Sequence, residues 1–209
     1  MKFAESSINA LVRKVQAALR LGIFTSVRIL LDRAVLGILS RFFGFHPWHA
    51  AAPLSARPYR RVVADLVNEL NPRRVVEVGC GLGSILSLVR ARERYGYDVD
   101  GGVIRAARLI RSRDISFIQG DMRAVSQSNI DVLILCNWIH DFGPEQLDSW
   151  ITPLLSRTSY LLLDAMDSNG PEGYRFKHDF GFLGARATCV TVRRAPGEGR
   201  TFSVYKVVP

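Results

Sequence analysis

The chain has 209 residues, of which 48% are hydrophobic and 22% charged, a composition that indicates one folded domain with an extension and excludes a disordered chain. Its formal net charge of +9 would suit nucleic acid or an anionic membrane, but the basic residues are scattered, which a solvated basic surface also explains. Three cysteines without the spacing of a disulfide framework indicate a reducing compartment, so we expect a cytoplasmic protein.

Residues 1–45 are predicted to form an N-terminal helical arm. From Ile8 to Phe45, apolar residues recur at helical spacing with basic residues between them. The uncharged stretches are shorter than the roughly twenty residues that a membrane span needs, and arginines interrupt any signal-peptide core. We expect the arm to pack on the domain as a cap over its ligand. A basic amphipathic helix on an anionic membrane surface and a dimer contact remain as alternatives.

Residues 46–58 are predicted to be a proline-rich loop, because three prolines should prevent a helix there. The loop carries His46 and His49, but no third ligand lies nearby in the sequence, so we expect no metal site. A lid near a substrate suits this aromatic-bearing loop better. A helix over 58–70 then begins the main domain, residues 59–209.

A strand and a glycine-rich turn follow, and a helix is predicted over 84–92. The apolar run over 75–78 fits a buried parallel strand. Glu77 lies within this strand, two residues before the first glycine of the turn. An acid there would repel a bound pyrophosphate and attract a cationic ligand. Glycines let the backbone turn tightly and pass close to a ligand, and they stand at alternate positions: Gly79, Gly81 and Gly83.

The first motif of the class I S-adenosylmethionine-dependent methyltransferases closely resembles the segment Glu77-Val78-Gly79-Cys80-Gly81-Leu82-Gly83. The cofactor of that family carries an amino group and a sulfonium but no phosphate. The resemblance covers roughly residues 59–209 and implies a doubly wound α/β domain. Its seven-stranded sheet would be mostly parallel and Rossmann-like, with one antiparallel strand. It also implies S-adenosylmethionine as cofactor, with Glu77 pairing with the amino group.

Two acids are predicted to hold the nucleoside of that cofactor. Asp98 ends the second strand, where a carboxylate can accept from both ribose hydroxyls, and the resemblance places the ribose ligand there. Asp100 is expected to cap the next helix. After the third strand, Gly120-Asp121-Met122 resembles the adenine clamp of the family. In that clamp the carboxylate of Asp121 accepts from the exocyclic amine and the amide of Met122 donates to a ring nitrogen, although such an Asp is often only a turn residue.

The fourth strand, residues 131–136, is predicted to lead to the chemistry, because ligands of open parallel sheets bind beyond the carboxyl ends of the strands. The next segment resembles the small-molecule branch of the family, in which a His-Asp-aromatic stretch lies over the methyl acceptor. We expect Asn137 to contact the cofactor and Trp138 the substrate. His140 is predicted to be the general base, held by Asp141 or another nearby carboxylate. The alternative is that His140 caps the next helix or lines the pocket.

The remaining residues complete the predicted domain. A helix is expected over 144–155 and a strand over 160–163, followed by a long loop. His178 lies in that loop within a second His-Asp-Phe element and is expected to face the substrate, with an ordinary surface loop as an equal alternative. Alternating residues over 187–193 and 201–208 predict a closing β-hairpin.

The sequence therefore predicts methyl transfer from S-adenosylmethionine to an oxygen or nitrogen of a small molecule. A nucleic-acid or protein methyltransferase and a non-catalytic S-adenosylmethionine-binding protein are the alternatives. Nucleic acid is the less favoured partner, and a membrane surface would be reached through the N-terminal arm. The sequence leaves the acceptor and the oligomeric state open.

Overall fold

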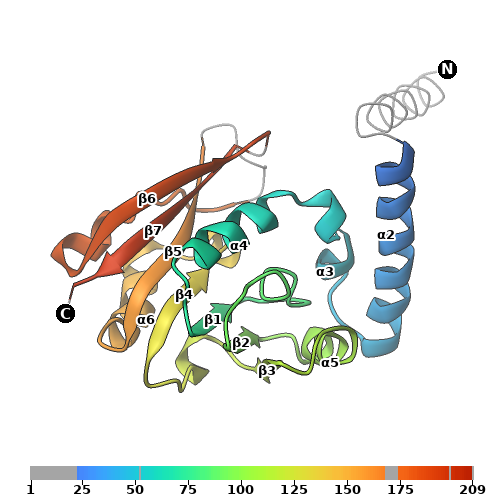
Figure 1. The fold of residues 1–209 in the computed structure, drawn as a ribbon, viewed down its shortest axis with the longest axis horizontal. Helices are drawn as coiled ribbons and strands as arrows, with labels where there is room; N and C mark the ends of the chain where they lie inside the picture. Colours follow the sequence, from blue (N-terminus) through green and yellow to red (C-terminus); the bar gives the residue numbers. More distant parts are fainter. Residues whose placement is uncertain (1–22, 52, 168–173, 198, 209) are drawn as a thin grey trace.

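A seven-stranded sheet forms the centre of the molecule in this computed structural model (Figure 1). The structure describes residues 23–51, 53–167, 174–197 and 199–208. The strands are β1 (Arg74–Val78), β2 (Glu93–Asp98), β3 (Ile115–Gln119), β4 (Ile130–Leu135), β5 (Thr158–Met166), β6 (Ala187–Ala195) and β7 (Arg200–Val207).

The strand order is β3-β2-β1-β4-β5-β7-β6. The first five of these pair in parallel, whereas β7 is antiparallel to both β5 and β6. Only β7 therefore runs against the others, and the predicted doubly wound α/β sheet is confirmed. The order reverses direction between β1 and β4, which opens a crevice at their carboxyl ends.

Helices and short 3-10 turns cover both faces of the sheet. The α-helices are α2 (Ile23–Phe43), α3 (Trp48–Ala51), α4 (Tyr59–Glu69), α5 (Gly101–Ile110) and α6 (Pro144–Leu155). The 3-10 turns are η1 (Leu54–Ala56), η2 (Met122–Ala124), η3 (Trp138–Asp141) and η4 (Gly181–Arg186). The predicted helix over 144–155 and the predicted hairpin are present, and the predicted strand over 160–163 is longer at both ends.

Two apolar clusters, one on each side of the sheet, bury the strands. Residues of α4, α5 and the segment after β1 form one cluster, and residues of α6 and η4 form the other. Val75 belongs to the first cluster and Val76 to the second, and neither is exposed. Because successive side chains of a strand point to opposite faces, a continuous apolar run is what a strand covered on both sides requires.

The segment after the glycine turn corrects one prediction. Residues 81–88 form consecutive turns, not the helix expected over 84–92. The connection from Val78 of β1 to Glu93 of β2 is therefore built from turns, although its 14 residues, 79–92, meet the dozen or more that a parallel crossover needs. Side chains satisfy carbonyls that a helix would have used internally: Arg94 donates to Leu86 and Val89, and Asn68 to Leu88.

The prediction of a loop without helix over 46–58 is also wrong, because this segment contains α3 and η1. Its prolines begin these elements without interrupting them. Pro47 directly precedes α3, Pro53 precedes η1 and Pro58 precedes α4. A proline is tolerated at the start of a helix, where its missing N–H would have had no partner within the helix.

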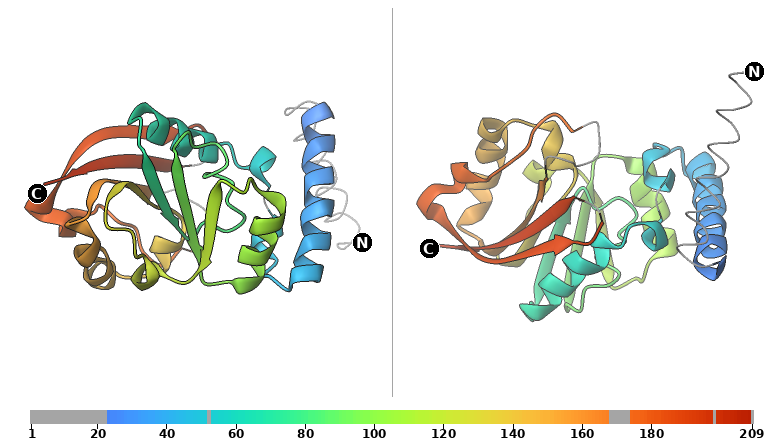
Figure 2. Two further views of the ribbon diagram at one scale, coloured as in Figure 1. Left: turned by 60° about the horizontal axis from the view of Figure 1, so that its bottom comes forward. Right: turned by 90° about the horizontal axis from the view of Figure 1, so that it is seen from above.

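The described part of the N-terminal arm is the single helix α2, at one end of the molecule (Figure 2). It lies beside α3 and α5, and Leu36, Leu39 and Phe43 pack against the first cluster. Residues 1–22 of the predicted arm lie outside the described residues. Among the helices that the structure describes, none has the length and apolarity needed to cross a bilayer.

Asp131 joins the start of β4 to the start of β1. Its Oδ2 atom accepts from the backbone amides of Arg73 and Arg74 at 2.7 and 2.8 Å. Asp131→Ala should therefore lower the free energy of unfolding by about 1–3 kcal/mol, because it leaves two strand-end amides without their acceptor. Urea denaturation measures this. The matched change Asp114→Ala, at a mostly exposed carboxylate, should have little effect, and equal losses in both variants would contradict the assignment.

Candidate active site

A cavity of about 770 Å³ opens at the carboxyl ends of β1, β2, β3 and β4. Its floor comes from the residues that follow these strands, and its far wall from α2, α3 and the segment 53–57. Both the volume and the position, at the reversal of strand order, are those of ligand pockets in open α/β sheets. Among the described residues, no group of three or more His, Cys, Asp or Glu side chains could hold a metal ion.

The glycine turn lies directly against this cavity. Gly79, Gly81 and Gly83 have φ values of +73°, +51° and +66°, a region that other residues rarely adopt. A Cβ atom on Gly79 would lie 2.2 Å from Cδ1 of Trp138, and one on Gly81 would lie 3.0 Å from Nδ1 of His49. The glycines are therefore required both by the backbone and by the rings that pack over it.

Glu77 places a buried carboxylate at the base of the cavity. Its side chain lines the pocket with 4% of the residue exposed, and Oε2 has no hydrogen-bond partner among the described residues. Burial, opposed by the charge of Arg60 and aided by that of Asp98, raises the pKa of Glu77 to about 8. A buried carboxylate oxygen without a partner fits a ligand that brings a positive charge and N–H donors.

Asp98 ends β2 beside the glycine turn, as predicted, and also lines the cavity. Its Oδ2 atom accepts from the amide of Gly81 at 2.8 Å, and Oδ1 accepts from that of Asp100 at 3.0 Å. Each carboxylate oxygen can accept a further bond, so both remain able to bind hydroxyls. Asp100 caps α5 through the amides of Gly102 and Val103, which confirms its predicted capping role.

Asp121 and Met122 lie at the edge of the same cavity. The carboxylate of Asp121 accepts from the amide of Arg123 at 2.9 Å and forms an ion pair with its guanidinium at 2.5 Å. This pairing holds the pKa of Asp121 below its usual range. A ligand amine that approaches Asp121 would therefore have to share the carboxylate with Arg123.

Asn137, after β4, holds a strained backbone at the other end of the cavity. Its φ and ψ are 71° and −71°, and the amide of Trp138 donates to the carbonyl of Cys136 at 3.0 Å. This is a γ-turn with positive φ at its centre, a rare and costly conformation. The turn is fixed by a bond from the Asn137 amide to Asp164 at 2.9 Å. It directs the Trp138 indole to donate to the carbonyl of Val78 at 2.7 Å.

The structure corrects the prediction for His140. The ring is fully buried and does not line the cavity; its Nε2 atom lies 3.3 Å from Oδ2 of Asp164. The neighbouring carboxylate is Asp164, which agrees with the predicted alternative to Asp141, and Asp141 lines the cavity instead. The reason is the 3-10 geometry of η3, in which residues three apart share a side. Trp138 and Asp141 therefore both face the cavity, and His140 faces the interior.

His178 also lies away from the cavity. It is buried, its Nε2 atom is 3.1 Å from the carbonyl oxygen of Ile139, and its ring centroid is 5.6 Å from that of His140. Burial lowers its pKa. The prediction that His178 faces the substrate is therefore wrong, because the ring packs beneath η3.

Several residues of the site belong to no recognisable sequence motif and were not predicted. Arg200, at the start of β7, forms an ion pair with Asp164 at 3.1 Å and donates to the hydroxyl of Tyr174 at 2.9 Å. Its guanidinium lies 4.5 Å from the ring centre of Tyr59, which lines the cavity together with Tyr174. Five aromatic side chains also line the cavity: Tyr59, Trp138, Phe142, Trp150 and Tyr174.

Gly79→Ala and Gly197→Ala form a matched pair. Both glycines have left-handed φ, +73° and +75°, so alanine carries about the same backbone cost of 1–2 kcal/mol at each. Only at Gly79 does the added Cβ meet another side chain, Trp138. Gly79→Ala should therefore lower unfolding stability more than the control and change tryptophan fluorescence. Equal stability and unchanged fluorescence would show that Trp138 does not lie against this turn.

The chain matches no protein-family model and no curated protein sequence. Solved structures do resemble it. The N-methyltransferase NodS from Bradyrhizobium japonicum WM9, in complex with S-adenosyl-L-homocysteine, has a TM-score of 0.62 and 15% identity over 82% of this chain and 97% of its own. Magnesium protoporphyrin IX methyltransferase from Synechocystis PCC 6803, with bound S-adenosylhomocysteine, has a TM-score of 0.58 and 17% identity over 72% and 84%.

A third similar structure is TehB from Haemophilus influenzae, with a TM-score of 0.57 and 17% identity over 71% of this chain and 62% of its own. At these identities the likeness is one of fold. The strand order, the glycine turn after β1 and the cavity at the strand ends agree with that likeness. This chain therefore has the fold of the class I S-adenosylmethionine-dependent methyltransferases.

Proposed function

We propose that this chain is an S-adenosylmethionine-dependent methyltransferase that acts on an oxygen or nitrogen of a small molecule. The observation that carries the proposal is the buried carboxylate of Glu77, which faces the cavity with Oε2 unpaired among the described residues. A cation with N–H donors would satisfy this oxygen. When bound, S-adenosylmethionine supplies an activated methyl group on a sulfonium, together with such an ammonium.

The charges of the cavity floor distinguish this cofactor from a nucleotide. Three acids, Glu77, Asp98 and Asp121, lie where the strands β1, β2 and β3 end. A phosphate-bearing ligand would meet these carboxylates at close range, which disfavours it. We assign Glu77 to the amino group, Asp98 to the ribose hydroxyls, and Asp121 with Met122 to the adenine. The similar folds solved with S-adenosylhomocysteine support this assignment.

The acceptor should lie against the aromatic wall beyond Asn137. Flat rings such as those of Trp138 and Tyr174 offer contact area with few polar groups, which suits a small molecule with an apolar or aromatic part. Methyl transfer depends mainly on alignment of the acceptor with the methyl group, so a rigid wall contributes directly to rate. Where the acceptor is a hydroxyl, Asp141 is the carboxylate placed to receive its proton.

The direct test is incubation of the protein with cell extract and isotopically labelled S-adenosylmethionine, followed by mass spectrometry of the products. One methylated small molecule would support the proposal, and cofactor binding without any methylated product across a broad metabolite set would contradict it. Calorimetric titration tests the cofactor site separately. Glu77→Gln and Asp98→Ala should each weaken binding about ten- to a hundredfold. Glu69→Gln should leave it unchanged, because Glu69 does not line the cavity and pairs with Arg193.

Glu77 should also make stability depend on pH. Its pKa rises from about 4.5 in the unfolded chain to about 8 in the fold, so the folded protein holds a proton that the unfolded chain releases. Stability of the ligand-free protein should therefore fall as pH rises from about 5 to 8, by a few kcal/mol on an order-of-magnitude scale. Glu77→Gln should flatten this dependence in thermal unfolding. An unchanged slope would mean that Glu77 is ionised in the fold.

His140 and Asp141 should behave differently when replaced. Asp141→Asn should leave stability unchanged and lower turnover of a hydroxyl acceptor about a hundredfold, because it removes the proton acceptor in the cavity. His140→Ala should instead lower unfolding stability by about 1–3 kcal/mol, since it removes one of the polar groups around the buried Asp164, which keeps Arg200 and the Asn137 amide. Asp148→Asn on α6 is the control for Asp141. Normal turnover in Asp141→Asn would remove Asp141 from the mechanism.

A further inference from the structure

The helix α2 has an apolar face that no described part of the chain covers. Phe24, Ile38 and Phe42 are 93%, 69% and 81% exposed. Together with Val27, Leu31 and Val35, which are also exposed, they recur every three or four residues along one side of the helix, which places them on a single stripe. We call this set the α2 stripe: Phe24, Val27, Leu31, Val35, Ile38 and Phe42.

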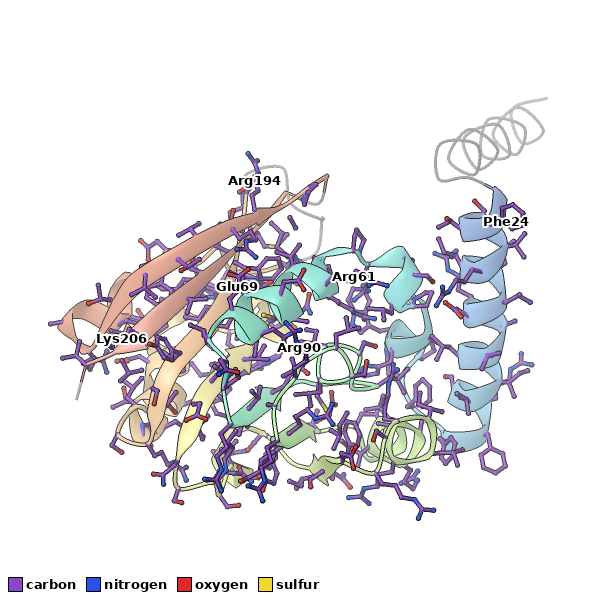
Figure 3. All side chains as sticks on the ribbon, viewed as in Figure 1. Phe24, Arg61, Glu69, Arg90, Arg194 and Lys206 are labelled. Atoms are coloured by element: carbon purple, nitrogen blue, oxygen red, sulfur yellow. The ribbon has the colours of Figure 1, made fainter. Side chains whose placement is uncertain are left out.

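The α2 stripe is distinct from the face by which the helix packs. Leu36, Leu39 and Phe43 point to the first cluster, and the stripe lies on another side of the helix. Figure 3 shows the side chain of Phe24 pointing away from the body of the protein. Contiguous exposed apolar surface of this kind is rare on soluble proteins and marks an interaction site.

The charged residues of α2 indicate which kind of partner the α2 stripe fits. Arg28, Arg33 and Arg41 project from α2 as exposed residues, and the helix has a single acid, Asp32, whose carboxylate accepts from the hydroxyl of Ser55 at 2.7 Å. In sequence, the first 43 residues contain seven basic and two acidic residues, so they carry +5 of the net charge of +9. With about 100° of rotation per residue, Arg28 and Arg41 lie on either side of the stripe, whereas Arg33 lies on the opposite side of the helix. An apolar stripe flanked by arginines is the pattern of helices that lie in the plane of an anionic membrane surface.

We propose that α2 docks through this stripe on an anionic lipid bilayer. The arginines beside the stripe would contact lipid phosphates while the apolar side chains enter the boundary of the acyl region. A second copy of the chain fits less well, because two such stripes facing each other would bring like-charged arginines together. Val35 belongs to the stripe and also lines the cavity, so docking holds the mouth of the cavity at the lipid surface.

Flotation of the full-length protein with lipid vesicles tests the proposal. At low salt, the protein should rise with phosphatidylcholine vesicles that contain phosphatidylglycerol and remain below with phosphatidylcholine alone. The double variant Ile38→Glu/Phe42→Glu should partition at least about tenfold less, because two apolar contacts become charges that the lipid repels. Val192→Glu is the control: Val192 is also largely exposed, on β6 at the sheet edge opposite β3, and this variant should float normally.

Three outcomes would overturn the proposal. In the first, wild-type protein stays at the bottom of the gradient in the presence of anionic vesicles. In the second, the double variant floats to the same extent as wild type. The third is a dimer in analytical ultracentrifugation that the double variant loses without any vesicle binding by wild type, which would assign the stripe to a second copy. Titration with S-adenosylmethionine keeps the two proposals separate, since neither Ile38 nor Phe42 lines the cavity. Protein that floats but binds no cofactor would refute only the methyltransferase function.

Discussion

The buried carboxylate of Asp164 holds together the segments around Asn137 at one end of the cavity. Lying near the end of β5, it accepts from the amide of Asn137 after β4, pairs with Arg200 at the start of β7, and approaches His140 in η3. A buried charge is costly unless it is surrounded by such partners, so each of these segments stabilises the position of the others. The strained turn at Asn137 persists because this network fixes both sides of it.

The strain at Asn137 has a structural consequence at the opposite side of the crevice. It turns Trp138 so that the indole bonds to the carbonyl of Val78 and covers Gly79, where no larger residue would fit. The indole bond thereby holds the segment after β4 against the end of β1, at the point where the strand order reverses. These contacts hold the wall of the cavity in one arrangement without a ligand, and such preorganisation favours catalysis by positioning.

Arginine side chains support the end of the cavity that contains the glycine turn. The segment after the glycine turn is a series of turns, and Arg111 on the far side donates to the carbonyl of Leu82 at 2.7 Å and to the hydroxyl of Ser84 at 3.2 Å. Arg94 donates to two carbonyls later in the same segment, those of Leu86 and Val89. Part of the high arginine content is thus structural. Because these arginines bond within the protein, the net positive charge is weaker evidence for nucleic-acid binding. The arginines of α2, in contrast, are exposed and could contact a partner.

The sequence by itself determined the elements whose signals are local. The apolar run of β1, the glycines after it and the capping Asp100 each follow from the conformation that those few residues prefer. Only the tertiary structure decided that His140 faces inward, because the direction of a side chain in η3 depends on the register of one short turn. It also decided that Asp164 meets Arg200, since such a contact exists only once β5 and β7 become neighbours in the sheet.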